Sequence, residues 1–285
     1  MGSGLMARRT GPAPEHAGGA ATTNPFGGGP CLLLGGTLTL GSFGAYRGGR
    51  ALSDPLTLRL LPGTVLGVVG PNGVGKSSLL GALACSGVQS FGSLRYGDVD
   101  LPGMPPRRRA SVVSLLPQDL RAPDELRVRE LVEIGAHASQ HPHAGEAARS
   151  ALADAGVEDL AQRRYGSLSG GQRQLVQLAR VLAQDTPVVI FDEPTSALDL
   201  FHQRAVEQTM RRLGNDGKIV IAALHDLSLA LNACTQILLL DGGGGSHAGR
   251  PAEVLQPELV HAAYGVHTTI HTTPHGRSFL ATDDR

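Results

Sequence analysis

The sequence predicts an α/β protein with a mainly parallel sheet core, an N-terminal antiparallel β subdomain and an inserted α-helical subdomain. Three observations carry this prediction. Apolar strand runs alternate with helical stretches in the second half of the chain, short strand runs separated by turn signals precede residue 70, and a stretch from about residue 120 to 165 lacks strand runs altogether.

The first 30 residues are rich in Gly, Pro, Ala and Thr, and hold too little apolar material to offset the entropy of ordering them. We therefore expect residues 1–30 to be a disordered tail. From residue 32 to 69, runs such as "LTLRL" and "VLGVV" are separated by "GG", "SDP" and "LPG". This pattern is typical of a small β region that leads into a buried strand.

In the central and C-terminal parts of the chain, the spacing of the apolar residues differs from that in the N-terminal β region. The segments "DELRVRELVEIGAHA" and "GEAARSALADAGV" space their apolar residues as helices do, which predicts a helical subdomain at about residues 120–168. The apolar runs "VVIF", "IVIAAL" and "ILLL" then alternate with helical stretches and indicate a parallel sheet covered on both faces. "DGGGGSHAG" is typical of a hairpin tip, and we expect a C-terminal tail from residue 271 to 285.

The composition excludes several classes of protein. The formal net charge is zero and the only basic cluster is "RRR" at 107–109, so nucleic acid is not expected as a partner. No apolar run approaches the roughly 18 to 20 residues that cross a bilayer, and the first residues lack the apolar core of an export signal. The three cysteines have neither zinc-site spacing nor an even count, which favours a reducing compartment.

A glycine-rich phosphate loop lies between a predicted strand and a predicted helix. The segment "GPNGVGKSS" contains G-x-x-x-x-G-K-S in the strand, loop and helix context that this motif requires. Its glycines let backbone N–H groups approach phosphates, and Lys76, one of only two lysines, supplies a point charge. The Ser77 hydroxyl suits a magnesium ion. The residues expected to bind nucleotide here are Gly70, Pro71, Asn72, Gly73, Val74, Gly75, Lys76, Ser77 and Ser78. The fold class is therefore that of a P-loop NTPase.

A second motif, "VVIFDEPTSALD", ends an apolar strand in two adjacent acids. Ligands bind at the carboxyl ends of parallel strands, so Asp192 is expected to hold magnesium directly or through water. Glu193 is expected to orient or deprotonate an attacking water, and the sequence leaves open which of the two it does. The alternative is an acidic turn without a catalytic role.

The P-loop, "LSGGQ" at Leu168–Gln172 and "FDEP" at Phe191–Pro194 occur in that order, and the set resembles the ATP-binding subunit of ABC transporters. The resemblance runs from about residue 33 to 270 and implies an ATP-binding domain at residues 31–270 that uses ATP and Mg2+. It implies that Ser169, Gly170, Gly171 and Gln172 face the nucleotide of an opposite subunit. It further implies that Gln118 contacts magnesium and the attacking water, and that His225 contacts the γ phosphate. Asp199 matches the aspartate in the loop after the acidic motif, and Tyr46 matches an aromatic residue that stacks on adenine. A strand tyrosine packed in the core remains the alternative for Tyr46.

Finer features, "HDLSLALNACTQILLLDGG" and "GRPAEVLQPELVHAAYGV", resemble ATPases that serve importers of iron-siderophore complexes, haem or cobalamin. The resemblance implies a second ATP-binding subunit, integral membrane permease subunits and, indirectly, an extracytoplasmic substrate-binding protein. It places the chain at the cytoplasmic face of the membrane. The alternatives are an ABC ATPase for another cargo, a non-transport ABC ATPase, and a small-molecule kinase, which would not need "LSGGQ". The histidines in "HASQHPHAG" and "VHTTIHTTPH" allow a metal site, although solvated positions explain them more simply.

Overall fold

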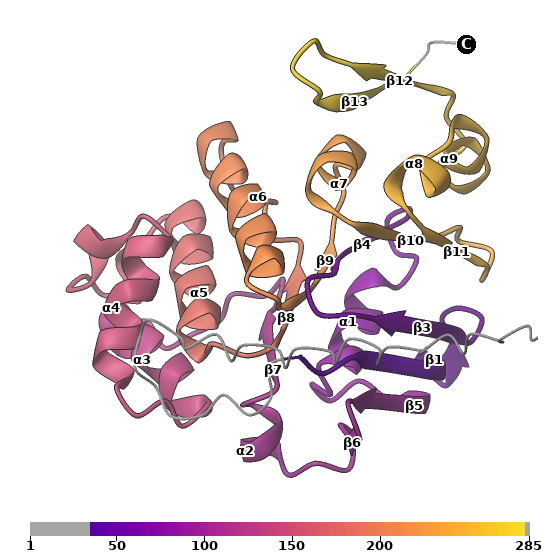
Figure 1. Cartoon of the computed structure of the whole chain (residues 1–285). Coiled ribbons are helices and arrows are strands. Elements are labelled where there is room, and N and C mark those ends of the chain that lie inside the picture. The colour runs from indigo at the N-terminus through magenta and orange to yellow at the C-terminus, as the bar shows by residue number, and fades with distance from the viewer. Residues whose placement is uncertain (1–34, 283–285) are drawn as a thin grey trace, which may run out of the picture.

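The computed structural model describes residues 35–282 (Figure 1). The predicted disordered tail at residues 1–30 lies outside the described residues. Two larger sheets, a two-stranded hairpin and the helices around them make up the described part, and the observed α/β architecture confirms the predicted fold class.

The larger sheet has six strands in the order β11-β10-β4-β9-β8-β7. All neighbours in it run parallel except β11, which pairs antiparallel with β10 across the predicted hairpin. The strands are β4 (Val65–Val69), β7 (Val113–Leu116), β8 (Val188–Asp192), β9 (Ile219–Ala223), β10 (Gln236–Leu240) and β11 (Ser246–Gly249). The three strands β4, β8 and β9 are buried at every position, as expected where helices or a second sheet cover both faces.

The smaller sheet is antiparallel, and β1 pairs in it with β2, β3 and β5. Its strands are β1 (Leu38–Arg47), β2 (Arg50–Ala51), β3 (Leu56–Leu60), β5 (Ser90–Tyr96) and β6 (Val99–Asp100). A bulge in β1 between Leu40 and Phe43 shifts the register against both β3 and β5, and Ser42 there has a φ of 47°. Bulges of this kind bend and twist a strand.

Helix α1 (Lys76–Leu83) contacts β1 of the small sheet and β8 and β9 of the large one, so it fills the space between the two sheets. On the other side of the large sheet, α3 and α4 pack on α5, and these three lie together at the left of Figure 1. The remaining helical elements are α2 (Pro106–Arg109), α3 (Val128–Ala138), α4 (Ala144–Asp154), η1 (Glu158–Leu160), η2 (Tyr165–Ser167), α5 (Gly170–Gln184), α6 (Leu200–Asn215), α7 (Leu227–Ala233), α8 (Pro251–Val254) and α9 (Pro257–Tyr264).

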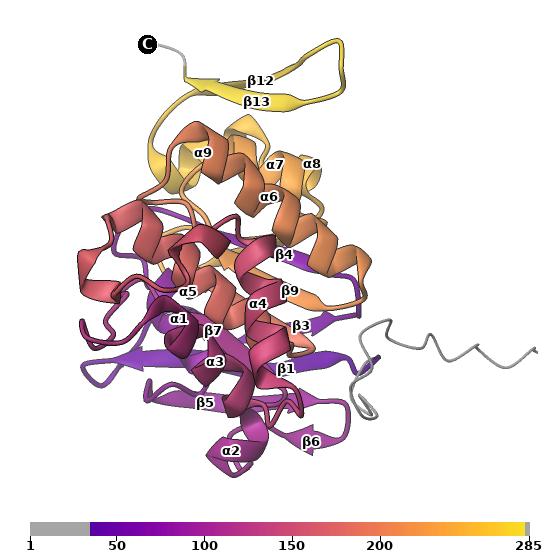
Figure 2. The same ribbon diagram turned by 90° about the vertical axis from the view of Figure 1, so that its left-hand side faces the viewer.

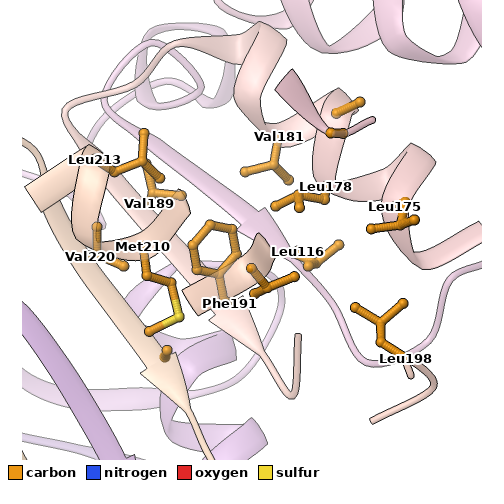
Figure 3. Close-up of a cluster of buried hydrophobic side chains, with 14 of the residues drawn as sticks. Leu116, Leu175, Leu178, Val181, Val189, Phe191, Leu198, Met210, Leu213 and Val220 are labelled. Carbon is orange, nitrogen blue, oxygen red and sulfur yellow. The ribbon is translucent and has the colours of Figure 1, made fainter. Parts of the chain in front are cut away.

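Strand β8 divides its side chains between the two hydrophobic cores. Val189 and Phe191 point into the core shared with α5 and α6, while Ile190 points into the core that contains α1. Phe191 is fully buried, and Figure 3 shows its ring between Leu178 of α5 and Met210 of α6. Because side chains alternate along a strand, the next residue, Asp192, faces the α1 side. The alternation thus aims a carboxylate at the N-terminus of α1.

The C-terminal residues form a hairpin of β12 (Thr268–Thr272) and β13 (Ser278–Thr282). It lies at one end of the molecule, beyond α7, α8 and α9, in both views (Figures 1 and 2). Residues 271–282 of the predicted C-terminal tail are part of this hairpin. The reason is a turn at Gly276, with a φ of 78°, that returns the alternating segment "SFLAT" against "TTIHT".

Candidate active site

The P-loop connects β4 to α1, and its glycines are required by geometry at two positions. At Gly70, with a φ of 151°, a Cβ would meet the carbonyl oxygen of Leu240 at 2.5 Å. Gly75 is the N-cap of α1, has a φ of 110° and offers no side chain to the first amides of the helix. These N–H groups are therefore available to an anionic ligand.

A pocket opens at this helix end. It is lined by Arg47, Asn72, Gly73, Gly75, Lys76, Ser77, Ser78, Glu193 and His225. The structure thus brings most of the predicted P-loop residues together with two predicted catalytic residues. Gly70, Pro71 and Val74 belong to the same loop but do not line the pocket.

Lys76 is almost fully buried, with 4% of its surface exposed. Its ammonium group donates to the carbonyl oxygens of Gly70, at 2.8 Å, and Pro71, at 3.1 Å. Burial lowers the pKa of Lys76, and the carboxylates of Glu193 and Asp192 oppose that shift. The loop therefore holds a poorly solvated cation, which an incoming phosphate group would stabilise.

Ser77, which lines the pocket, contacts Asp192, which lies beside the pocket but does not line it. The Ser77 hydroxyl donates to Oδ1 of Asp192 at 3.0 Å. Burial raises the pKa of Asp192, the bond from Ser77 opposes the rise, and the nearby charge of Glu193 adds to it. A buried carboxylate beside a hydroxyl is an oxygen donor set that suits Mg2+, so these residues fit the ion that the sequence predicts.

Glu193 is the centre of the predicted catalytic group. Its Oε1 lies 2.5 Å from Nε2 of His225, and its Oε2 accepts from Nε2 of Gln118 at 2.9 Å. Its backbone φ is 53°, a left-handed conformation that costs a non-glycine residue on the order of 1 kcal/mol or more. The carbonyl oxygen of Glu193 accepts from Nε2 of Gln174 at 3.3 Å, which helps to hold this conformation. The three residues predicted as catalytic thus meet at one carboxylate.

Tyr46 does not line the pocket, although its neighbour Arg47 does. The Tyr46 ring lies 5.0 Å from the ring of Phe91, centroid to centroid, and is tilted against it by 54°. A stacking partner for adenine and a packed strand tyrosine both remain compatible with this position.

The segment Ser169–Gln172 is also absent from the residues that line the pocket. Ser169 caps α5, and its hydroxyl accepts from the Gln172 amide at 3.3 Å while the Gln172 side chain accepts from the Ser169 amide at 3.1 Å. Gly171 lies against the loop that leads to α6, since a Cβ on it would meet the Ala197 carbonyl oxygen at 3.1 Å. Asp199, which caps α6, follows in that loop and accepts from the His202 amide at 2.9 Å.

The ABC transporter family model matches residues 53–196, which is half of the chain and includes the P-loop, the segment Ser169–Gln172 and both acids. The chain belongs to this family. Two related proteins are hemin import ATP-binding proteins, of Pseudomonas entomophila and of Gloeobacter violaceus. The first is 41% identical over 80% of this chain and 92% of its own length. The second is 40% identical over 83% of this chain and 90% of its own length. The chain is an ABC transporter ATPase that binds ATP.

Solved ABC transporter structures share the fold. A chain of a transporter in an inward-facing conformation matches with a TM-score of 0.74 and 24% identity, over 88% of this ATPase and 98% of that chain. A nucleotide-free ATP-binding cassette matches with a TM-score of 0.67 and 21% identity, over 80% of this ATPase and 98% of that chain. Within residues 35–282, none of the helices of this ATPase has the length and apolar character needed to cross a membrane.

Two residues of this ABC ATPase site were not predicted. Arg47 lines the pocket, and the only signal for it in the sequence is its place next to Tyr46. Gln174 supports the backbone of Glu193 although it lies on the buried face of α5, with 3% of its surface exposed. A polar residue inside an otherwise apolar helix stripe is the signal that marks it. Among residues 35–282, no three or more His, Cys, Asp or Glu side chains are grouped so that they could hold a metal ion.

Proposed function

We propose that this ABC ATPase is the ATP-hydrolysing subunit of an importer whose cargo is haem. The site chemistry is carried by one observation: a carboxylate, that of Glu193, is held by His225 and Gln118 at the edge of a pocket that Lys76 and the P-loop also line. The cargo is inferred from the hemin import proteins, which resemble this chain over most of its length. Iron-siderophore complexes and cobalamin are the other cargoes that the sequence resemblance allows.

In this proposal the P-loop binds the phosphates of ATP. The amides at the start of α1 and the buried ammonium group of Lys76 face the negative charge, and phosphate replaces carbonyl oxygens as the main partner of Lys76. Ser77 and Asp192 hold Mg2+, together with Gln118. The ion, when bound, offsets the charge of the β and γ phosphates.

Glu193 positions the attacking water and accepts its proton, while His225 and Gln118 orient the carboxylate. His225 then turns toward the γ phosphate. The contact with His225 opens in this step, and each carboxylate oxygen keeps a lone pair free to accept from the attacking water.

The segment Ser169–Gln172 completes the site of a second subunit. It lies outside the pocket of its own chain, and its place at the N-terminus of α5 suits a γ phosphate. We infer a head-to-tail homodimer that closes on ATP and reopens after hydrolysis, with Asp199 between the two sites. Integral permease subunits transmit this motion, and a substrate-binding protein delivers the cargo on the other side of the membrane. The ATPase is then peripheral, at the cytoplasmic face.

The Glu193→Gln variant tests the site. Amides cannot accept the proton, so we expect hydrolysis to fall by a factor on the order of 100 to 10,000 while ATP binding persists. The variant should accumulate as an ATP-dependent dimer in size-exclusion chromatography, and Lys76→Ala, which lacks the phosphate contact, is the control that stays monomeric. A Glu193→Gln protein that remained monomeric with ATP and hydrolysed normally would refute the assignment.

The identity of the cargo is tested by transport measurements in reconstituted membranes. The ATPase is purified with the membrane protein that accompanies it and reconstituted in liposomes, and uptake of haem, a ferric siderophore and cobalamin is compared. We expect ATP-dependent uptake of haem alone. Uptake of another cargo would replace haem in the proposal, and recovery of ribosomes or DNA in place of a membrane protein would exclude a transport role.

A further inference from the structure

The hairpin β12–β13 is attached to α6 and to α7, the helix that begins two residues after His225. A two-stranded hairpin is at best marginally stable alone, so its contacts with the rest of the chain decide its position. Three of them go to α7 and α6. The Asn232 side chain donates to the Ser278 carbonyl oxygen at 2.6 Å and accepts from the Ser278 amide at 3.1 Å. The Ser228 hydroxyl accepts from the Leu280 amide at 3.1 Å.

The third contact is an ion pair with a buried member. Glu207 of α6 is 5% exposed, and its Oε2 lies 2.9 Å from Nη2 of Arg277 in the turn of the hairpin. Removal of one member of such a pair leaves a carboxylate without its cation in a poorly solvated place, which is strongly unfavourable. Arg277 is therefore the charged anchor of the hairpin.

Helix α7 depends on this support. It has seven residues, fewer than the roughly 12 to 15 that an isolated helix needs to be stable in water. Its N-cap is Asp226, whose Oδ1 accepts from the Ser228 amide at 2.7 Å, and the residue before Asp226 is His225. A continuous chain of contacts thus runs from the hairpin through Ser228 and Asp226 to the imidazole that contacts Glu193.

We propose that the hairpin β12–β13 is a positioning element of the hydrolytic site, which fixes α7 and thereby keeps His225 at the pocket, where it contacts Glu193 and can turn toward the γ phosphate. The inference rests on the roles proposed above for His225 and Glu193. No residue of the hairpin lines the pocket, so loss of the hairpin contact should slow hydrolysis without weakening nucleotide binding.

The Arg277→Ala variant of the full chain tests the proposal, with Arg212→Ala as its matched control. Arg212 lies on α6 and forms an ion pair with Asp154 of α4 at 3.0 Å. Its side chain is 44% exposed, against 43% for that of Arg277. For Arg277→Ala we expect faster hydrogen–deuterium exchange at residues 227–233, a kcat lower by a factor on the order of ten, and an ATP Kd within about twofold of wild type. Arg212→Ala should match wild type in all three, and Arg277→Lys should recover most of the lost kcat.

Ser228→Ala is a milder second variant that removes only the hydroxyl, and it should shift exchange and kcat in the same direction if Arg277→Ala proves too unstable to purify. Unchanged exchange at α7 in these variants, or an unchanged kcat despite faster exchange, overturns the proposal. A His225→Ala protein that hydrolyses ATP at the wild-type rate would instead remove the proposed role of His225, so the two failures are distinguishable.

Discussion

Two helices of this ABC ATPase begin at glycine-containing segments, yet their N-termini are in opposite states. Helix α1 begins after Gly75, which has no side chain to cap it, and the pocket beside it is lined by Lys76 and Glu193. Helix α5 begins after Ser169, and Ser169 and Gln172 cap each other's amides. The first N-terminus is open to a ligand, whereas the second already has internal partners.

The difference supports the proposal that the two motifs bind phosphate in different ways. In the proposal, the open end binds a nucleotide with groups of its own chain, including the ammonium group of Lys76, whose pKa burial lowers. The capped end lines no pocket with the P-loop of the same chain, and its Ser169 hydroxyl accepts from the Gln172 amide while its own O–H stays free to donate to a ligand. A single glycine-rich pattern therefore predicts a helix N-terminus in both places but not the ligand.

The largest expected effect distinguishes the N-terminus of α1 from that of α5 in a subunit that is dilute enough to be monomeric. Lys76→Ala removes a charged phosphate contact, and we expect ATP to bind more weakly by a factor on the order of 10 to 100. Ser169→Ala should leave the Kd of the monomer within about twofold of wild type. Isothermal titration calorimetry with a non-hydrolysable ATP analogue measures both. Equal losses in the two variants would mean that α5 binds the nucleotide of its own chain.

A second prediction concerns hydrolysis by the dimer. Ser169→Ala should lower the rate per subunit by a factor on the order of ten at concentrations where the wild type dimerises, because one phosphate donor is lost. The wild-type rate per subunit should itself fall on dilution, and phosphate release measured across a concentration series checks both. A wild-type rate that stays constant down to the monomer would contradict the comparison.

A third prediction uses the buried acid at the open end. The pKa of Asp192 is raised above 3.8 by burial, so its ionisation opposes folding: the stability it contributes is complete below 3.8 and is lost as pH rises through the folded pKa. Asp192→Asn should therefore raise the Tm of the nucleotide-free protein by a few degrees at pH 7, and the gain should shrink as pH falls toward 4. Thermal denaturation across that range is the measurement, and a gain that grows on acidification would reverse the assigned sign.

The smallest effect is expected at the capped end. Gln172→Ala removes one half of the reciprocal cap and should lower the free energy of unfolding by about 0.5 to 1 kcal/mol. Gln208→Ala is the control, because Gln208 is exposed in the middle of α6 and has no capping role. Urea denaturation measures the free energy of unfolding of both variants. An equal change in both variants would show that the cap adds nothing to stability.

The sequence predicted the parts of this molecule that are governed by local pattern. Strand β8 is apolar at every position before Asp192, and its period places Asp192 opposite Ser77. The P-loop needs glycine at Gly70 and Gly75 for steric reasons, which a motif can record. Tertiary contacts were harder to predict from the sequence. The polar Gln174 on a buried helix face, the Arg47 at the pocket edge and the return of β13 onto β12 depend on residues far apart in the chain, and periodicity alone does not report them.

The arrangement of Glu193 has a consequence for idle subunits. Each of its carboxylate oxygens has a partner, His225 for one and Gln118 for the other. The strained backbone keeps the side chain where these partners can reach it. If His225 contacts the γ phosphate as proposed, a subunit that meets ATP away from its transporter begins with that imidazole paired to Glu193 instead. The resting geometry then acts as a brake on futile turnover, and release of that brake is the event that a docked permease and a second subunit would have to bring about.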